Sequence, residues 1–178
     1  MDTSELKFGR RYEYSALSNV TVIDGDSFRV DIDVGLDLFL RYTDIRLARY
    51  DAPEVSQRKG YAPNHRQAGL AVTRVVNKWF TMVAARECVL TLHSEYKIKL
   101  EEHRTTKDLF GRLIGDFSYT EGGSAKYLSY FLTNNGLVQE LDTSGRRRPW
   151  KVQALADVIT NATAAQSRLS NIIRASTK

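Results

Sequence analysis

The sequence predicts an α+β fold, and two patterns in its apolar residues support this. Residues 13–50 alternate apolar and polar side chains at period two, as strands with one buried face do. Later segments repeat apolar residues at helical spacing, with further strand-like runs between them. Strands first and then helices alternating with strands favour an α+β domain, and a five-stranded barrel with helices packed around it fits this order.

The predicted strands are short and separated by turn residues. Gly25 divides the first two strands, and the sequence DVGLD turns between the second and the third. The polar stretch RTTKDLFG connects the last two strands. The five expected strands occupy residues 13–24, 26–34, 36–50, 87–100 and 112–119.

Three helices are predicted as well. The first, 63–80, has Pro63 in its first turn and an apolar face of Leu70, Val72, Val75, Val76 and Trp79. The second, 124–136, begins at a Ser124 cap and ends at an Asn-Gly pair. The third, 149–174, is amphipathic, with a stripe of Val152, Leu155, Ile159, Ala162, Leu169 and Ile173.

The composition is that of one soluble globular domain over residues 1–178, with 42% hydrophobic and 26% charged residues. No apolar run has the length that crosses a bilayer. The first residues, MDTSELKFGRRYEYSAL, lack the charged-then-apolar order of a secretory signal, so we expect a cytoplasmic protein without a membrane partner.

Cysteine and histidine offer no metal site of their own. Cys88 is the only cysteine, which excludes an intrachain disulfide and a thiolate zinc cluster. His65, His93 and His103 show no ligand spacing. Any metal ion in this protein must therefore be held by oxygen atoms.

Positive charge gathers at the C-terminal end. The net charge is +5, and residues 144–178 carry seven basic residues against one acid. Two interpretations stay open for this extension: a solvated helix start, or a phosphate-binding segment that contacts nucleic acid through Arg146, Arg147, Arg148 and Lys151. The helix that follows packs either on the barrel or on a second subunit, as in a dimer.

Three segments place charged residues at strand ends or turns, where a fold gathers distant side chains into one site. They are VIDGDSFRV with Asp24 and Asp26, IRLARYDAPE with Arg46, Asp51 and Glu54, and DLFGRLIG with Asp108 and Arg112. Taken singly, each segment has a plain structural explanation: DGD after a strand is usually a tight turn, DAPE is a loop with proline, and an arginine on a strand usually lies on a solvated face.

Taken together, these residues suit phosphodiester chemistry. Asp26 and Asp51 offer the carboxylate oxygens that hard divalent cations such as Ca²⁺ prefer. Glu54 is placed to take a proton from a water molecule. Two arginines can bind a phosphodiester and stabilise the charge that grows on it, because the planar guanidinium matches two phosphate oxygens.

In these three motifs the chain resembles the staphylococcal nuclease (thermonuclease) family. The motifs stand here as IDGDS (23–27), RLARYDAPE (46–54) and DLFGR (108–112), and GLVQEL resembles the segment that ends the family barrel. The resemblance covers about residues 12–141, which would form the barrel core, followed by the basic extension and helix of 144–178. It implies a five-stranded OB-type β-barrel with three α-helices.

The resemblance also implies a calcium site. Asp26 and Asp51 match the family's Ca²⁺-ligating aspartates, and Asp24 matches a nearby acid that supports them. Ala52 stands where the family usually has threonine, whose backbone carbonyl binds the ion. A carbonyl survives this change, so we expect the ligation to survive too.

The remaining roles follow from the same match. Glu54 matches the residue proposed as general base, and Arg46 and Arg112 match the phosphate-binding arginines. Phe110 replaces a tyrosine that contacts a terminal phosphate in the family, and DTSGRRR replaces tyrosines that lie against a nucleobase.

The leading hypothesis is a Ca²⁺-dependent nuclease that cleaves DNA and RNA with low sequence specificity and leaves 3′-phosphate ends. The alternative is a nuclease-fold module that binds nucleic acid or protein without cutting. A plain oligonucleotide-binding barrel is a third interpretation, which would need aromatic stacking platforms. The sequence does not decide between endonuclease and exonuclease action.

Overall fold

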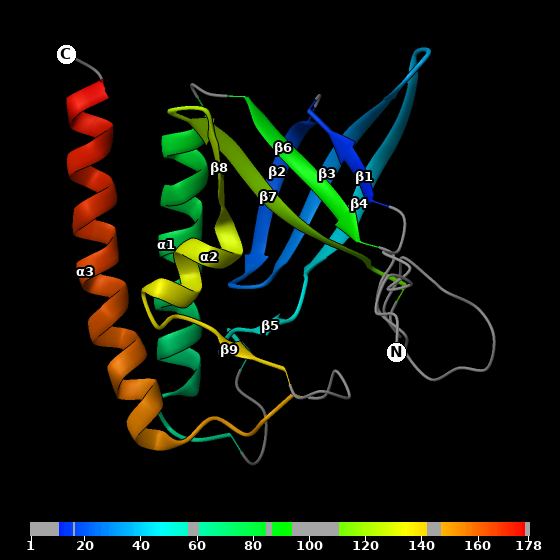
Figure 1. The fold of residues 1–178 in the computed structure, drawn as a ribbon. Helices are drawn as coiled ribbons and strands as arrows, with labels where there is room; N and C mark the ends of the chain where they lie inside the picture. Colours follow the sequence, from blue (N-terminus) through cyan, green and yellow to red (C-terminus); the bar gives the residue numbers. More distant parts are fainter. Residues whose placement is uncertain are drawn as a thin grey trace, which may run out of the picture.

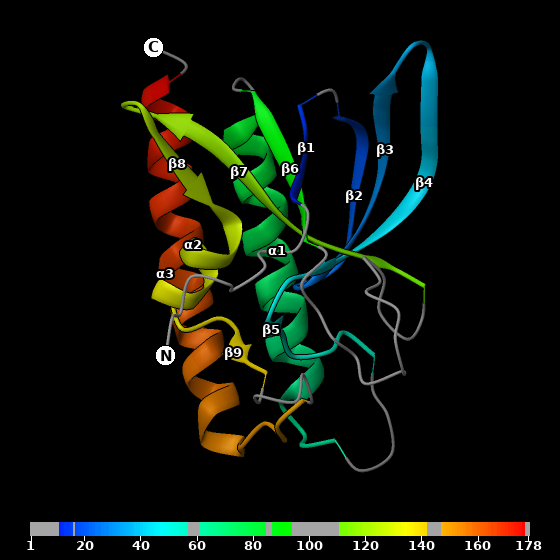
Figure 2. The same cartoon turned by 45° about the vertical axis from the view of Figure 1, so that its right-hand side comes forward.

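The computed structural model of the protein describes residues 11–15, 17–56, 61–84, 87–93, 111–141 and 147–176. These residues form a curved sheet, with helix α1 (His65–Val83) packed on it and helix α3 (Val152–Ser176) on the outer side of α1 (Figure 1). The view in Figure 2 shows the same succession of sheet, α1 and α3. The predicted α+β class is confirmed.

The main sheet mixes antiparallel and parallel pairs. Strands β2 (Leu17–Asp24), β3 (Ser27–Gly35) and β4 (Leu38–Leu47) form an antiparallel meander. Strand β4 then pairs in parallel with β7 (Leu113–Glu121), which places residues more than 60 positions apart in register, such as Arg46 with Ile114. On the far side of β7 follow β6 (Cys88–His93) and β1 (Arg11–Tyr14), both antiparallel to their neighbours.

The described part of the sheet is open, and its strand count differs from the prediction. The order is β1-β6-β7-β4-β3-β2, with β8 (Ser124–Tyr127) added to β7, so seven strands stand where five were expected. Two predicted strands are each divided in two. Residues 13–24 divide between β1 and β2. Residues 36–50 divide because Arg49 adopts a left-handed backbone (φ 70°) before β5 (Tyr50–Asp51), which pairs with β9 (Gln139–Glu140).

The predicted start of the second helix is wrong. Gly122 and Gly123 turn the chain with positive φ, so Ser124 begins strand β8 instead of capping a helix. Helix α2 (Leu128–Asn134) starts only after Tyr127. Its first turn is capped from a distant strand, because the carboxylate of Asp116 accepts the Ser129 N–H at 3.2 Å and also the Ser129 hydroxyl. The predicted end at the Asn-Gly pair is confirmed, with Gly136 at φ 62°.

The other two helices lie close to their predicted places. Helix α1 buries Val72, Val75, Val76 and Trp79 of its predicted face, whereas Leu70 is half-buried and Pro63 precedes the helix. Helix α3 packs side by side with α1 of the same chain. The buried stripe of α3 consists of Leu155, Val158, Ala162, Ala165 and Leu169, whereas Val152 is exposed. None of the helices in the described residues has the length and apolar character required to cross a membrane.

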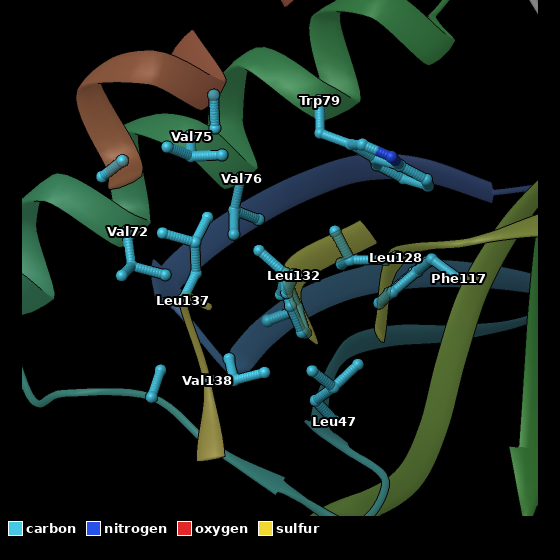
Figure 3. Close-up of a cluster of buried hydrophobic side chains, with 14 of the residues drawn as sticks. Leu47, Val72, Val75, Val76, Trp79, Phe117, Leu128, Leu132, Leu137 and Val138 are labelled. Carbon is cyan, nitrogen blue, oxygen red and sulfur yellow. The ribbon is translucent and has the colours of Figure 1, made fainter. Parts of the chain in front are cut away.

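The core joins the sheet to all three helices (Figure 3). Trp79 of α1, Phe117 of β7 and Leu132 of α2 are at most 2% exposed. The same cluster includes Leu47 at the end of β4 and Leu137 and Val138 before β9. Buried apolar contacts therefore fix the end of the sheet at which β4, β5 and β9 meet.

Asp31 fixes the opposite part of the meander. Its buried carboxylate accepts the Asn19 side-chain amide (2.8 Å), the Tyr42 N–H (2.7 Å) and Arg41 Nη1 (2.9 Å). Asn19 and Tyr42 both have positive φ, and the strand register shifts near both of them. The Asn19 hydrogen bond, and then those from Tyr42 and Arg41, lower the pKa of Asp31 to about 2. One carboxylate thus holds two bulges that flank β3.

Candidate active site

The candidate site lies where the β2–β3 turn, the end of β4 and the short pair β5–β9 come together, at the lower end of the sheet in Figure 1. It unites charged residues from separate segments of the sequence. Asp24 and Asp26 come from the β2–β3 turn, Arg46 from β4, Asp51 from β5, and Glu54 from the loop that follows.

A buried ion-pair triad forms its centre. Arg46 Nη1 donates to Asp26 Oδ1, and Arg46 Nη2 donates to Asp51 Oδ1 at 3.1 Å and to the Tyr50 carbonyl at 3.1 Å. The two aspartates are each 2% exposed, and Arg46 is 7% exposed. Burial, together with the nearby guanidinium groups of Arg147 and Arg112, lowers the pKa of Arg46. The predicted neighbours Asp26, Arg46 and Asp51 are therefore brought together.

Asp26 also organises the backbone around it. Its Oδ2 accepts the Ala52 N–H at 2.6 Å, and its own N–H donates to Asp24 Oδ1 at 3.1 Å. Its carbonyl accepts the Leu47 N–H at 2.8 Å. Burial raises the pKa of Asp24, against the opposing effects of the Ser27 hydroxyl and Arg46. The β2–β3 turn is thus bonded to the loop that carries Ala52.

Arg112 joins this group through Ser27. Its Nη1 donates to Ser27 Oγ at 3.0 Å, and Ser27 Oγ donates to Asp26 Oδ1 at 3.0 Å. The parallel pairing of β4 with β7, which starts one residue after Arg112, brings the two predicted arginines to the same end of the sheet. Asp108 and Phe110 of the same motif lie outside the described residues.

Glu54 is positioned by helix α1. A Cβ atom added to Gly69 would lie 2.4 Å from the Glu54 carbonyl oxygen and 2.6 Å from the Pro53 carbonyl oxygen. The helix backbone therefore packs directly on the loop, and only glycine permits this approach. Glu54 is thereby fixed in place from the side of the helix.

The segment before α3 completes the site. Arg147 Nε lies 3.0 Å from Asp51 Oδ1, and Arg147 Nη1 donates to Glu54 Oε1. Trp150 Nε1 donates to Asp51 Oδ2 at 3.1 Å, and Gln139 Nε2 donates to the Arg148 carbonyl at 2.6 Å. Although burial works against it, the hydrogen bond to Glu54 and the charge of Asp51 raise the pKa of Arg147.

Sequence reasoning placed Arg147 in a basic extension and did not assign Trp150 or Gln139 to the site. The signal available was the tryptophan inside RRRPWK, an aromatic residue next to clustered arginines. Arg148 and Lys151 are exposed. Arg146, the fourth candidate of that extension, lies outside the described residues.

The oxygen atoms that surround the Arg46 guanidinium are of the type that binds hard divalent cations. They are carboxylate oxygens of Asp26 and Asp51, and the two groups already share one positive charge, that of the guanidinium. In the part of the chain that the structure describes, no three His, Cys, Asp or Glu side chains stand together as a ready metal site. A cation held by Asp26 and Asp51 would therefore take over a charge that Arg46 now supplies.

No protein-family model matches this chain, and no curated protein matches its sequence. The likeness to a nuclease family accordingly rests on the three sequence motifs. The described geometry adds that Asp24, Asp26, Arg46, Asp51, Glu54 and Arg112 gather at one end of the sheet.

Proposed function

We propose that this protein is a Ca²⁺-dependent phosphodiesterase that cleaves DNA and RNA with little sequence preference. The observation that carries the proposal is the buried triad of Asp26, Arg46 and Asp51, with Glu54 and Arg112 joined to it. Buried charges are costly unless they are paired, and titratable groups gathered and buried in this way are candidates for a functional site.

Asp26, Asp51 and the backbone carbonyl of Ala52 would hold the ion. Bound Ca²⁺ would supply positive charge for the phosphate oxygens during displacement. Asp24 supports this arrangement by accepting the Asp26 N–H at 3.1 Å, which fixes the backbone that presents the Asp26 carboxylate.

Each side chain of this site has its own role in the reaction. Glu54 accepts a proton from the water that attacks phosphorus. Arg46 and Arg112 bind the non-bridging oxygens and stabilise the added negative charge. The P–O5′ bond breaks, the O5′ oxygen leaves as a hydroxyl after taking up a proton from solvent, and the other fragment keeps a 3′-phosphate.

Arg46 must change partners in this scheme. In the described structure its guanidinium is engaged by Asp26, Asp51 and the Tyr50 carbonyl. A two-pronged contact with a phosphate is open to it once it has left one of these acceptors. The substrate-free protein thus keeps the buried carboxylates of Asp26 and Asp51 paired with the arginine that later serves the substrate.

The finer fold that we propose is the OB-type barrel of the same family. Its five strands would be β2, β3, β4, β7 and β6. Support comes from the meander β2–β3–β4, from the parallel β4–β7 pair, and from contacts between β2 and β6 across the open edge of the sheet.

The first experiment measures cleavage of supercoiled plasmid and of single-stranded RNA by the purified protein with Ca²⁺, with Mg²⁺ and with chelator. Glu54→Gln is the test variant, and Glu140→Gln, an exposed acid on the adjacent strand β9, is its matched control. We expect Ca²⁺-dependent cutting that Glu54→Gln loses and Glu140→Gln keeps. Binding of nucleic acid without cutting under every condition would favour the non-cleaving module.

A further inference from the structure

The guanidinium of Arg147 lies inside the candidate site. It contacts Asp51, a proposed cation ligand, at 3.0 Å, and it is hydrogen-bonded to Glu54, the proposed base. Its side chain nevertheless keeps 42% of its surface exposed, whereas Asp51 keeps 3%. Arg147 is thus held by the site residues on one side and accessible to a ligand on the other.

We propose that Arg147 is a third phosphate-binding arginine of this site, held by Glu54 and Asp51 until a nucleic-acid phosphate replaces these carboxylates. The inference rests on the proposed function, because it needs the same site to bind a phosphodiester. It assigns Arg147 to the reacting phosphate and not to general contact with the nucleic-acid backbone.

The charge balance of the site supports this role. Among the described residues the site contains four carboxylates and three guanidinium groups, counted here in their charged forms: Asp24, Asp26, Asp51, Glu54, Arg46, Arg112 and Arg147. Without Arg147, two guanidinium groups face four carboxylates, and a divalent cation would bring the site only to neutrality. With Arg147, the same cation leaves one net positive charge. A site with a net positive charge attracts a phosphodiester anion more strongly than a neutral site does.

The segment that follows Arg147 is anchored at two points. The Arg148 carbonyl accepts Gln139 Nε2 at 2.6 Å, and Trp150 Nε1 donates to Asp51 Oδ2 at 3.1 Å. These two hydrogen bonds hold the backbone of the segment against β9 and β5. The guanidinium is therefore pre-positioned, which lowers the entropy that phosphate binding would cost.

The exchange of partners also links binding to catalysis. A guanidinium pairs with carboxylate and phosphate through the same planar fork, so a phosphate can replace Glu54 on Arg147 with little change in geometry. Once Arg147 has turned to the phosphate, the Glu54 carboxylate is free to accept a proton. Substrate binding would thus release the base that the reaction needs.

The test compares Arg147→Gln and Arg147→Lys with Arg66→Gln. Arg66 is an exposed arginine on α1 for which the described residues show no ion pair with the site carboxylates, so its replacement removes the same charge without removing a contact of the site. One arm measures kcat and KM for a single-stranded oligonucleotide with Ca²⁺. The other arm measures Kd of that oligonucleotide in chelator over a range of salt concentrations, by fluorescence anisotropy. Thermal melting of each variant shows that it is folded.

We expect Arg147→Gln to lower kcat/KM at least tenfold, largely through kcat, while Arg66→Gln stays within twofold of the wild type. We also expect the slope of log Kd against log salt to fall by about 0.7 for Arg147→Gln, the value of one lost phosphate contact on a single strand. Arg147→Lys should keep the salt slope and recover only part of kcat, because it retains the charge but not the fork.

Equal losses for Arg147→Gln and Arg66→Gln would overturn the inference. Faster cleavage by Arg147→Gln would overturn it as well, because Arg147 would then be an inhibitory contact. Failure of the proposed function is seen separately, as a folded wild type that cuts nothing. In that event the binding arm alone decides: a larger loss of affinity for Arg147→Gln than for Arg66→Gln supports the phosphate contact, and equal losses refute it.

Discussion

The Ala52 N–H donates to Asp26 Oδ2 at 2.6 Å and so joins the β2–β3 turn to the loop after β5 across 26 residues of sequence. The bond uses the backbone of Ala52 and not its side chain. The link between the two loops therefore does not depend on which side chain residue 52 carries. The site is fixed by main-chain geometry on one side and by the buried Arg46 on the other.

Arg46→Met should destabilise the protein strongly in chelator and much less with Ca²⁺. Removal of Arg46 takes away the ion pair that the structure shows for the buried Asp26 and leaves Asp51 paired with Arg147, which costs on the order of 3–5 kcal/mol. A bound cation would restore the missing charge and stabilise the folded state in proportion to its occupancy.

Urea unfolding of this variant, with and without CaCl₂, checks the prediction. The matched control is Arg29→Met, which breaks the exposed pair with Asp44 at 2.8 Å and should leave stability close to that of the wild type in either condition, because an exposed ion pair contributes little. A similar loss of stability for both variants in chelator would show that the triad is not the costly element. Equal stability of Arg46→Met with and without CaCl₂ would argue against a cation at Asp26 and Asp51.

Gly69→Ala should reduce both stability and activity. In an exposed helix interior, alanine stabilises the helix by about 1 kcal/mol relative to glycine. Here the new methyl group would lie 2.4 Å from the Glu54 carbonyl, and overpacking of this kind costs about 1–3 kcal/mol. The loop must move away from α1, and Glu54 moves with it.

Thermal melting and cleavage rates measure the two effects of Gly69→Ala, with Arg74→Ala, an exposed change on the same helix, as control. Unchanged activity in a folded Gly69→Ala protein would contradict the proposed support of Glu54 by α1.

Asp116→Asn should change how stability depends on pH. Burial, opposed by the hydrogen bonds from Ser129 and Phe117, raises the pKa of Asp116 to about 6 from 3.8. Between these two values the folded state binds more protons than the unfolded chain, so the contribution of Asp116 to stability falls as pH rises from about 4 to about 6. A shift of this size corresponds to roughly 3 kcal/mol.

The isosteric Asn keeps an acceptor for the Ser129 N–H and carries no charge. We therefore expect Asp116→Asn to gain stability relative to the wild type as pH rises through this window, measured as the difference between the two urea midpoints. A difference that stays constant from pH 4 to pH 7 would show that Asp116 does not titrate there.

Asp31→Asn should show the opposite pH dependence. The pKa of Asp31 is lowered to about 2, so its charged form stabilises the folded state above the ordinary value near 3.8, and this contribution is lost as pH falls through about 2. The variant should be less stable than the wild type at pH 7, and the gap should narrow in strong acid. Hydrogen exchange of Tyr42, whose N–H the carboxylate accepts at 2.7 Å, should increase at neutral pH. Unchanged exchange at Tyr42 would mean that the bulge is held by other contacts.

The regular elements with clear periodicity could be predicted from the sequence. The β2–β3–β4 meander follows from period-two alternation, and α1 and α3 follow from their apolar stripes. The break between β4 and β5 could not be predicted, because Arg49 carries no local signal for a left-handed backbone. Strand β8 could not be predicted, because the sequence SAKY is also typical of a capped helix start. Its strand conformation depends on pairing with β7, which is a tertiary contact.

Some contacts of the candidate site could be predicted from the sequence and others could not. The closeness of Asp26, Arg46 and Asp51 was implied by motifs in which all three lie within 26 residues of one another. Trp150 reaches Asp51 across 99 residues, and Arg147 reaches Glu54 across 93. No local pattern encodes contacts of this length, because they depend on where α3 packs against α1.

The indole of Trp150 gives the protein an optical probe of its own. The chain has two tryptophans: Trp79 is 2% exposed in the core, and Trp150 is hydrogen-bonded to Asp51. A Trp79→Phe variant would leave a single tryptophan, whose hydrogen-bond acceptor belongs to the site. Any ion or nucleotide that engages Asp51 would then shift the emission of this one residue, so that occupancy can be followed by fluorescence in an unlabelled protein.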